Sequence, residues 1–373
     1  MGLIHATSLE RWEEWERTRH RGRLLKHTLT GALRRQRGDD GAASGPRYVL
    51  RSRGGEGPRL LIAVDSATPT SRASLLTALP YLRGAVDVLA PVGVDLPETA
   101  GAGWSGSAPA GMDVEEAARA LPGRGITAVV SLGQHLGAGR IAHEHAAASG
   151  TAAFVVQHGA LTPFAPPLPP ETTLLSWSDA DGEFWRSGRE DITVRTIGSQ
   201  LLWQARHEAG LAGAGTTGAG AAQPAPEADP QARPVFLGQL HGAELPRRVT
   251  GGAAYTFCRL HDGLYRPHPS ETDKLSRATH EVWRRRGVEF APADVPLREV
   301  TSPVVAVFST GVLEAAARGV PSYVFAPKAP DWVAELWDRY GMRRFGAPRP
   351  TPSPLLPSAE PAAALAEILD GAA

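Results

Sequence analysis

The 373-residue sequence contains a single cysteine, Cys258, three lysines among 39 basic residues, and no net charge. One cysteine excludes an internal disulfide and a cysteine-rich metal cluster. The zero net charge argues against a protein whose main surface binds nucleic acid. The sequence has no apolar run of roughly 18 residues that would suit a membrane span, and its start, Met1-Gly2-Leu3, has no apolar signal core. These absences predict a cytoplasmic protein.

Several motifs that carry well-known chemistry are also missing. The sequence has no P-loop, and no G-x-G-x-x-G motif follows a predicted strand in its first half. It shows no spacing of histidine, cysteine and carboxylate residues typical of metal ligands. These absences argue against a kinase and against a dinucleotide oxidoreductase, and we expect neither a metal ion nor a cofactor.

The pattern of apolar residues predicts an α/β fold. Buried strands such as 60–65 and 126–131 alternate with helical stretches such as 71–82 and 141–148. Strands separated by helices favour a parallel sheet that is covered on both faces. The length exceeds that of one typical domain, and 42% of the residues are apolar, which is enough for two cores.

We therefore predict two Rossmann-like, doubly wound parallel-sheet domains that face a cleft. The expected order is a basic amphipathic helix (1–46), a first domain (47–208), a flexible linker rich in alanine, glycine and proline (209–233), and a second domain (234–373) that ends in a helix over 359–369.

The N-terminal segment predicts one long helix over residues 9–37, with Ser8 as its cap. Residues 17–37 carry eight arginines and lysines and no acid, while Trp12 and Trp15 begin an apolar face. Such a helix could touch an anionic membrane surface or a nucleic acid. We favour a helix that packs on the protein and leaves its arginines in solvent, with peripheral contact at the inner membrane face as the alternative.

Polar residues follow three predicted strands of the first domain. Gln157-His158-Gly159 comes directly after the strand 153–156, at the edge of the sheet where ligands bind in such folds. His158 is the side chain best suited to accept a proton near neutral pH. Asp65 and the pair Gln134 and His135 hold similar places after earlier strands, and we regard them, with Gln157, as secondary candidates.

Two motifs of the second domain indicate a phosphate site. In Arg266-Pro267-His268-Pro269, two prolines stiffen a strand end that carries an arginine and an imidazole. Glu271 is a secondary candidate, which could cap the next helix or orient His268.

The second motif is Ser309-Thr310-Gly311, which follows a buried strand and opens a helix. A helix N-terminus directs free N–H groups at an anion, and Gly311 would allow that anion a close approach. Glu314 lies one turn into the helix, where it could accept hydrogen bonds from ribose hydroxyls.

Together these motifs resemble the GT-B glycosyltransferase superfamily over residues 60–346. The nearest resemblance is to its bacterial capsule and wall-polymer branch, which includes polysialyltransferase-like and CDP-glycerol glycerophosphotransferase-like enzymes. The resemblance implies that His158 activates the acceptor, that His268 contacts the donor phosphate, and that Ser309 and Thr310 hold it.

We therefore expect transfer of a sugar or polyol phosphate from a nucleotide-activated donor to an acceptor hydroxyl. Two alternatives remain open. A non-hydrolysing nucleotide-sugar epimerase would need acidic residues beside the sugar, for which Asp65 and Glu183 are candidates. A non-catalytic protein on the same fold would bind nucleic acid or a protein partner through the basic N-terminal helix.

Overall fold

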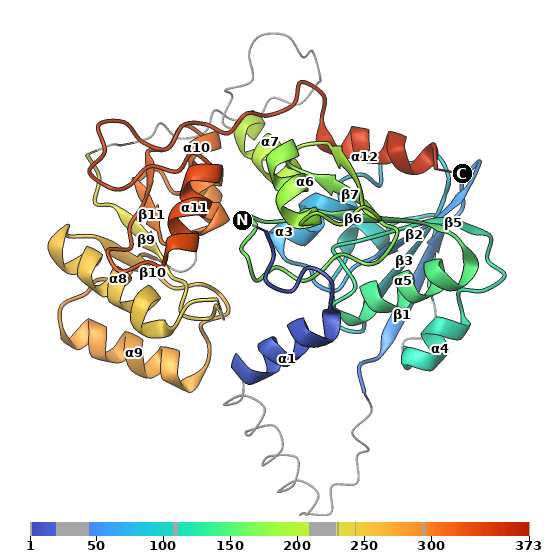
Figure 1. Ribbon diagram of the computed structural model, residues 1–373, viewed down its shortest axis with the longest axis horizontal. Helices are drawn as coiled ribbons and strands as arrows, with labels where there is room; N and C mark the ends of the chain where they lie inside the picture. The colour runs from blue at the N-terminus through green and yellow to red at the C-terminus, as the bar shows by residue number, and fades with distance from the viewer. Residues whose placement is uncertain are drawn as a thin grey trace, which may run out of the picture. The chain divides into compact units, whose positions relative to one another are not determined.

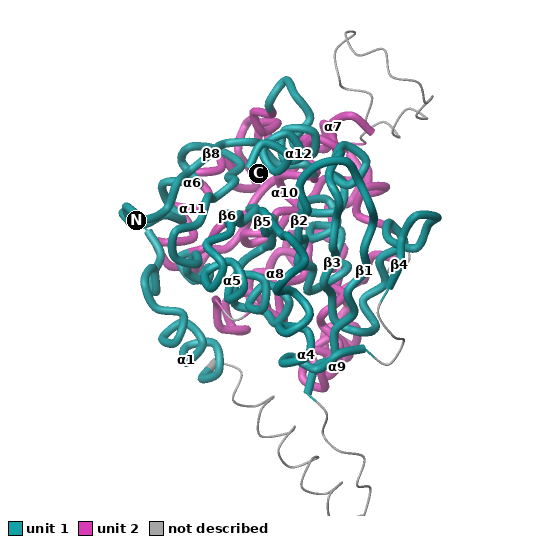
Figure 2. Tube along the Cα trace, turned by 90° about the vertical axis from the view of Figure 1, so that its right-hand side faces the viewer, with its two compact units in different colours: residues 1–159, 163–200, 357–373 teal, residues 160–162, 201–356 magenta. Residues whose placement is uncertain are grey.

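The computed structural model in Figure 1 describes residues 2–19, 45–106, 111–208, 229, 231–242, 244–292 and 295–372. The chain divides into two compact units, coloured separately in Figure 2. Unit 1 comprises residues 1–159, 163–200 and 357–373, and unit 2 comprises residues 160–162 and 201–356. Each unit contains its own sheet, so the expected α/β class is confirmed.

The sheet of unit 1 has eight strands in the order β4-β1-β3-β2-β5-β6-β7-β8. The run from β3 to β8 is parallel: β2 (Arg59–Ala63), β3 (Ala85–Pro91), β5 (Ile126–Ser131), β6 (Ala152–Val156), β7 (Thr173–Ser176) and β8 (Thr193–Thr196). Two further strands, β1 (Tyr48–Arg53) and β4 (Trp104–Gly106), extend one side in antiparallel pairing.

Alternating side chains of these strands build a separate core on each face of the sheet. Along β2, Leu60 and Ile62 pack with the π-helix Arg72–Leu76 and with α12 (Pro361–Asp370). Leu61 and Ala63 pack on the other face, with α4 (Val114–Arg119) and α5 (Gly137–Ser149). Figure 1 shows α12 and α5 on opposite sides of the sheet. Burial on both faces explains why these strands read as continuous apolar runs.

The remaining helices of unit 1 are short or lie outside its two cores. They are α1 (Leu9–Arg19), α3 (Pro69–Ser71), a 3-10 turn (Pro97–Thr99) and α6 (Asp179–Arg186). Helix α1 packs on the protein through Trp12, whose ring nitrogen donates to the Phe164 carbonyl at 2.7 Å, and through Trp15, which stacks on the Phe164 ring. Helix α7 (Gln200–Glu208) begins at the last residue of the 163–200 segment and continues into unit 2.

The sheet of unit 2 is parallel throughout, in the order β10-β9-β11-β12. Its strands are β9 (Val235–Leu237), β10 (Leu264–Arg266), β11 (Val304–Ala306) and β12 (Ser322–Val324). Its helices are α8 (Arg247–Leu260), α9 (Lys274–Arg285), a 3-10 turn (Leu297–Glu299), α10 (Thr310–Ala317) and α11 (Asp331–Arg339).

Several elements differ from the sequence-based expectations. The helix expected over 71–82 is a π-helix that gives way to turns, because Pro80 has no N–H to continue it. Strands β1 and β4 and helix α8 were not anticipated. In α8, Gly251 and Gly252 hide the helical pattern, yet a β-carbon at Gly251 would lie 3.1 Å from Leu240.

One expected boundary differs, and two further predictions lie largely outside the described residues. The final helix, α12, belongs to unit 1, although the sequence-based division assigned residues 234–373 to the second domain; Leu365, Ala366 and Leu369 supply the reason by joining the core of unit 1. The predicted linker 209–233 lies mostly outside the described residues, as does the part of the predicted N-terminal helix beyond Arg19.

Candidate functional site

Each sheet has a topological switch point, where the order in which successive strands join the sheet reverses. Polar residues lie at the carboxyl ends of the strands beside this point. In unit 1 this point lies between β2 and β5, and in unit 2 between β9 and β11. Ligands of open α/β sheets bind at such points, beyond the carboxyl ends of the strands. Nearly all the candidate residues follow these strands or their direct neighbours.

In unit 2, two histidines from neighbouring strand ends stack on each other. His241 follows β9 and His268 follows β10; their ring centroids are 3.8 Å apart and their planes differ by 19°. The pKa of His268 is lowered to about 4, mainly because its ring is partly shielded from water and secondly because His241 lies beside it. The His268 Nδ1 atom accepts a hydrogen bond from the Ser270 N–H at 3.1 Å, which fixes the ring. Its Nε2–H is then the group free to donate.

Glu271 supports this pair from inside the unit. Its buried carboxylate accepts from the Leu240 N–H at 2.9 Å, the Tyr265 hydroxyl at 2.8 Å and the His280 ring at 2.9 Å, and it lies 4.0 Å from His241 Nδ1. Hydrogen bonds to its charged form outweigh burial and lower the pKa of Glu271. The residue therefore stabilises the loop after β9, whereas the cap of α9 is Asp273.

The turn after β11 opens helix α10 as the sequence indicates. The Ser309 hydroxyl caps the helix by accepting from the Gly311 N–H at 3.1 Å, and the Thr310 hydroxyl accepts from the Ala160 N–H at 3.0 Å. A β-carbon at Gly311 would lie 2.6 Å from Leu237 and 3.0 Å from Leu297. Close packing within the unit thus accounts for this glycine.

Arg266 and Glu314 complete the candidate site of unit 2. The Arg266 guanidinium donates to the Val295 carbonyl at 2.6 Å and remains half-buried. Burial raises the pKa of Glu314, although Arg318 and Arg266 oppose that shift. A desolvated carboxylate beside two guanidiniums is a suitable acceptor for hydroxyl groups.

Two residues of this edge were missed in the sequence. The Gln239 side-chain oxygen accepts from the N–H groups of Val307 and Phe308, both at 3.1 Å, and thereby joins the loops after β9 and β11. His241 is the partner of His268 described above. The signal that could have found both is the segment Gly238-Gln239-Leu240-His241, which follows a strand as Gln157-His158-Gly159 does.

In unit 1, His135 and His158 follow β5 and β6, and both have a buried Nδ1 atom without a hydrogen-bond partner among the described residues. Burial lowers the pKa of His158 to about 4. Burial, then His158 and Arg140, lowers the pKa of His135 to about 4. Both rings are therefore neutral at pH 7. A neutral imidazole can accept a proton, so His158 has the protonation state that a general base requires.

Asp65 occupies the point between β2 and β5. Its carboxylate accepts from the N–H groups of Ala138 at 2.7 Å and Gly139 at 3.0 Å, at the N-terminus of α5. Burial raises the pKa of Asp65 despite these two hydrogen bonds. The carboxylate thus fills the position in which a bound anion would otherwise meet this helix.

The two glutamines and Glu183 have different surroundings. Gln157 is buried; it accepts from the Trp177 N–H at 2.8 Å and donates to Asp181 at 3.2 Å, so it joins the ends of β6 and β7. Gln134 is half-buried in the loop before α5. Glu183 lies on α6 in an ion pair with Arg186 at 2.6 Å and is 60% exposed. Glu183 is therefore an exposed residue whose carboxylate is paired with Arg186.

In the described part of the chain, no helix is long and apolar enough to cross a membrane, and no group of three or more histidine, cysteine and carboxylate residues could hold a metal ion. Comparison of the sequence with models of known protein families and with curated protein sequences finds no significant match. The site is therefore interpreted from its own geometry.

Proposed function

We propose that the protein is a glycosyltransferase of GT-B type that transfers a sugar or polyol phosphate from a nucleotide-activated donor to an acceptor hydroxyl. In this proposal, the donor phosphates bind unit 2 at the carboxyl ends of β9, β10 and β11. His158 of unit 1 removes the acceptor proton. A metal ion is not required, because cationic side chains and a helix N-terminus offset the charge of the leaving group.

The observation that best supports a site for the nucleotide donor is a group of hydrogen-bond donors at the carboxyl ends of the strands of the second sheet. Arg266 brings a guanidinium, His268 and His241 bring stacked imidazoles, and α10 presents an N-terminus capped by the neutral Ser309. Guanidinium groups, imidazole rings and helix N-termini all bind phosphates in proteins. A phosphate that approaches the neutral His268 ring would also raise its pKa, so that binding takes up a proton.

Thermal unfolding of the full chain with CMP, CDP, UDP, GDP and dTDP tests the donor site. We expect one nucleotide to raise the melting temperature, since a ligand at 100 times its Kd stabilises a protein by about 2.7 kcal/mol. Arg266→Ala and His268→Ala should abolish that increase. The matched controls are Arg286→Ala, an exposed arginine just after α9, and His261→Ala, an exposed histidine that follows α8; both should keep it. No increase with any nucleotide would refute the donor site.

The base is tested separately by turnover. Release of the nucleotide from its sugar or polyol derivative should fall by about 10²- to 10⁴-fold in His158→Ala, which is the usual contribution of a general base. His145→Ala, on α5, serves as the control and should keep full turnover. Normal turnover in a folded His158→Ala protein would show that another group accepts the proton.

A further inference from the structure

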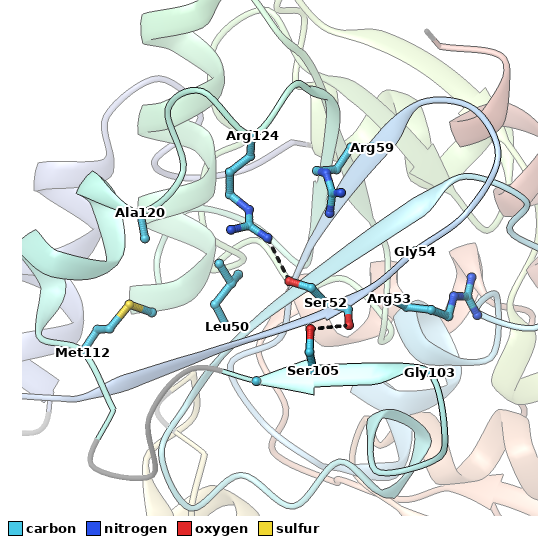
Figure 3. Close-up of a pocket in the computed structure, with 11 residues that line it drawn as sticks. Leu50, Ser52, Arg53, Gly54, Arg59, Gly103, Ser105, Met112, Ala120 and Arg124 are labelled. Carbon is cyan, nitrogen blue, oxygen red and sulfur yellow. Dashed lines mark hydrogen bonds between the residues drawn. The ribbon is translucent and has the colours of Figure 1, made fainter.

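Several arginines surround a hollow in unit 1. It lies at the end of the sheet opposite to His135 and His158. Figure 3 shows this hollow, which has a volume of about 500 Å³. Arg59 is the first residue of β2, Arg124 comes shortly before β5, and Arg53 ends the antiparallel strand β1. The hollow therefore lies where the parallel strands begin, apart from the sites described above.

A buried carboxylate holds two of these arginines in place. Asp87 is fully buried and accepts from Arg59 at 3.0 Å and from Arg124 at 2.6 and 3.0 Å. Its two arginine partners outweigh burial and lower the pKa of Asp87. Arg124 also donates to the Ser52 hydroxyl at 2.9 Å, as drawn in Figure 3. Both guanidiniums are thus positioned before any ligand arrives.

The charge around the hollow is not balanced. Arg53, Arg59 and Arg124 line it, no acidic residue of the described ranges does, and Asp87 beneath it compensates one of the three positive charges. Arg59 uses one nitrogen for Asp87, and Arg124 uses two for Asp87 and Ser52. Each guanidinium therefore retains N–H groups that have no acceptor among the described residues. Such groups suit the paired oxygens of a phosphate.

The rest of the lining suggests what accompanies the anion. One part consists of the apolar side chains Leu50, Met112 and Ala120, and another of the glycines Gly54 and Gly103, where no atom lies within 4 Å of an added β-carbon. A volume of this size matches those of small-molecule sites. We propose that this hollow binds a small phosphate monoester, with its phosphate on Arg59 and Arg124 and its apolar part on the Leu50 side.

Calorimetric titration of the full chain with phenyl phosphate and with inorganic phosphate, at constant ionic strength, tests the proposal. Phenyl phosphate should bind more tightly than inorganic phosphate, because its ring covers the apolar wall. Ser105→Asp places a negative charge in the hollow and should weaken binding by at least about tenfold, whereas the uncharged Ser105→Asn should change it less than about twofold. Both substitutions lie in unit 1. Phosphate that binds at the proposed donor site of unit 2 therefore contributes equally to the titrations of the two variants.

A second pair of variants removes a positive charge instead of adding a negative one. Arg59→Gln should also weaken binding by about tenfold, since it removes a charged donor. Arg51→Gln removes one charge from β1 at a residue outside the hollow and should bind normally. The proposal is wrong if the wild-type protein binds neither compound, or if Ser105→Asp and Arg59→Gln both bind like the wild type.

Discussion

Each sheet has a helix N-terminus beside its topological switch point, but different side chains accept the free N–H groups of the two helices. In unit 1, the Asp65 carboxylate accepts from the first N–H groups of α5, whereas in unit 2 the Ser309 hydroxyl caps α10. An internal anion satisfies the first helix, while a neutral cap leaves the positive end of the second helix uncompensated. The same topology therefore excludes a phosphate at the N-terminus of α5 and leaves the N-terminus of α10 open to one.

The histidines of the two units differ in exposure rather than in protonation state, because the pKa of His268 is also lowered to about 4. His135, His143 and His158 of unit 1 lie in surroundings that hold them neutral, and His143 shares a hydrogen bond of 2.8 Å with Ser131. His268 of unit 2 is exposed at a strand end. Equilibrium protonation of the buried rings should therefore destabilise unit 1, whereas an anion that binds beside the exposed His268 would raise the pKa of that ring.

The largest effect that we expect is a loss of stability of unit 1 in acid. Burial lowers the pKa of His135, His143 and His158 from 6.5 to about 4. Unfolded histidines take up protons below pH 6.5, so the stability that each contributes above that pH is lost as the pH falls toward 4. A shift of this size corresponds to roughly 3 kcal/mol for each residue. Urea unfolding of the full chain between pH 7 and pH 4 measures the sum.

A variant assigns part of that loss to one residue. His143→Gln can still form a hydrogen bond with Ser131 but does not titrate, so its free energy of unfolding should change less between pH 7 and pH 4, by roughly 3 kcal/mol. His261→Ala, at an exposed position, should keep the wild-type dependence. An identical pH dependence in His143→Gln would mean that this ring is protonated in the folded protein.

The next effect concerns Asp65. Asp65→Ala leaves the N–H groups of Ala138 and Gly139 without their acceptor, which should cost roughly 1–3 kcal/mol of unfolding free energy. Asp65→Asn should cost less, because its amide oxygen can still accept one of the two bonds. Urea unfolding at pH 7 compares them. Equal stability of all three proteins would show that solvent or a neighbouring group replaces the carboxylate.

Sequence patterns predicted the parts of the fold that depend on local chemistry. The strand 126–131 has the predicted bounds because it is a short, nearly continuous apolar run. The motif Ser309-Thr310-Gly311 was expected to open a helix, and Ser309 caps α10 in the structure. These features depend on a few neighbouring residues.

The remainder depended on contacts between distant residues. Strand β1, between β4 and β3, is half-buried and contains two arginines and a serine, so its apolar pattern is weak until β3 pairs with it. Helix α12 follows unit 2 in sequence but packs on unit 1, because Leu365, Ala366 and Leu369 join the core of that unit. The stacking of His241 on His268 likewise arises from the pairing of β9 with β10.

The substitution Ser309→Asp should change the stability least, and it tests the comparison between the N-termini of α5 and α10 most directly. Ser309→Asp would place a carboxylate at the N-terminus of α10, as Asp65 does for α5, and aspartate caps a helix as well as serine does. We therefore expect the free energy of unfolding to change by less than about 0.5 kcal/mol while the stabilising nucleotide of the proposed donor site no longer binds.

Ser309→Asn is the matched control, because asparagine caps equally well without a charge. It should retain the nucleotide-dependent increase in melting temperature that Ser309→Asp loses. If Ser309→Asp still responds to the nucleotide, the phosphates do not meet the end of α10, and the donor would then have to rest on Arg266 and the His241–His268 pair alone. If both variants lose the response, the serine hydroxyl itself contacts the donor, and the charge at the helix end is not what distinguishes the two sheets.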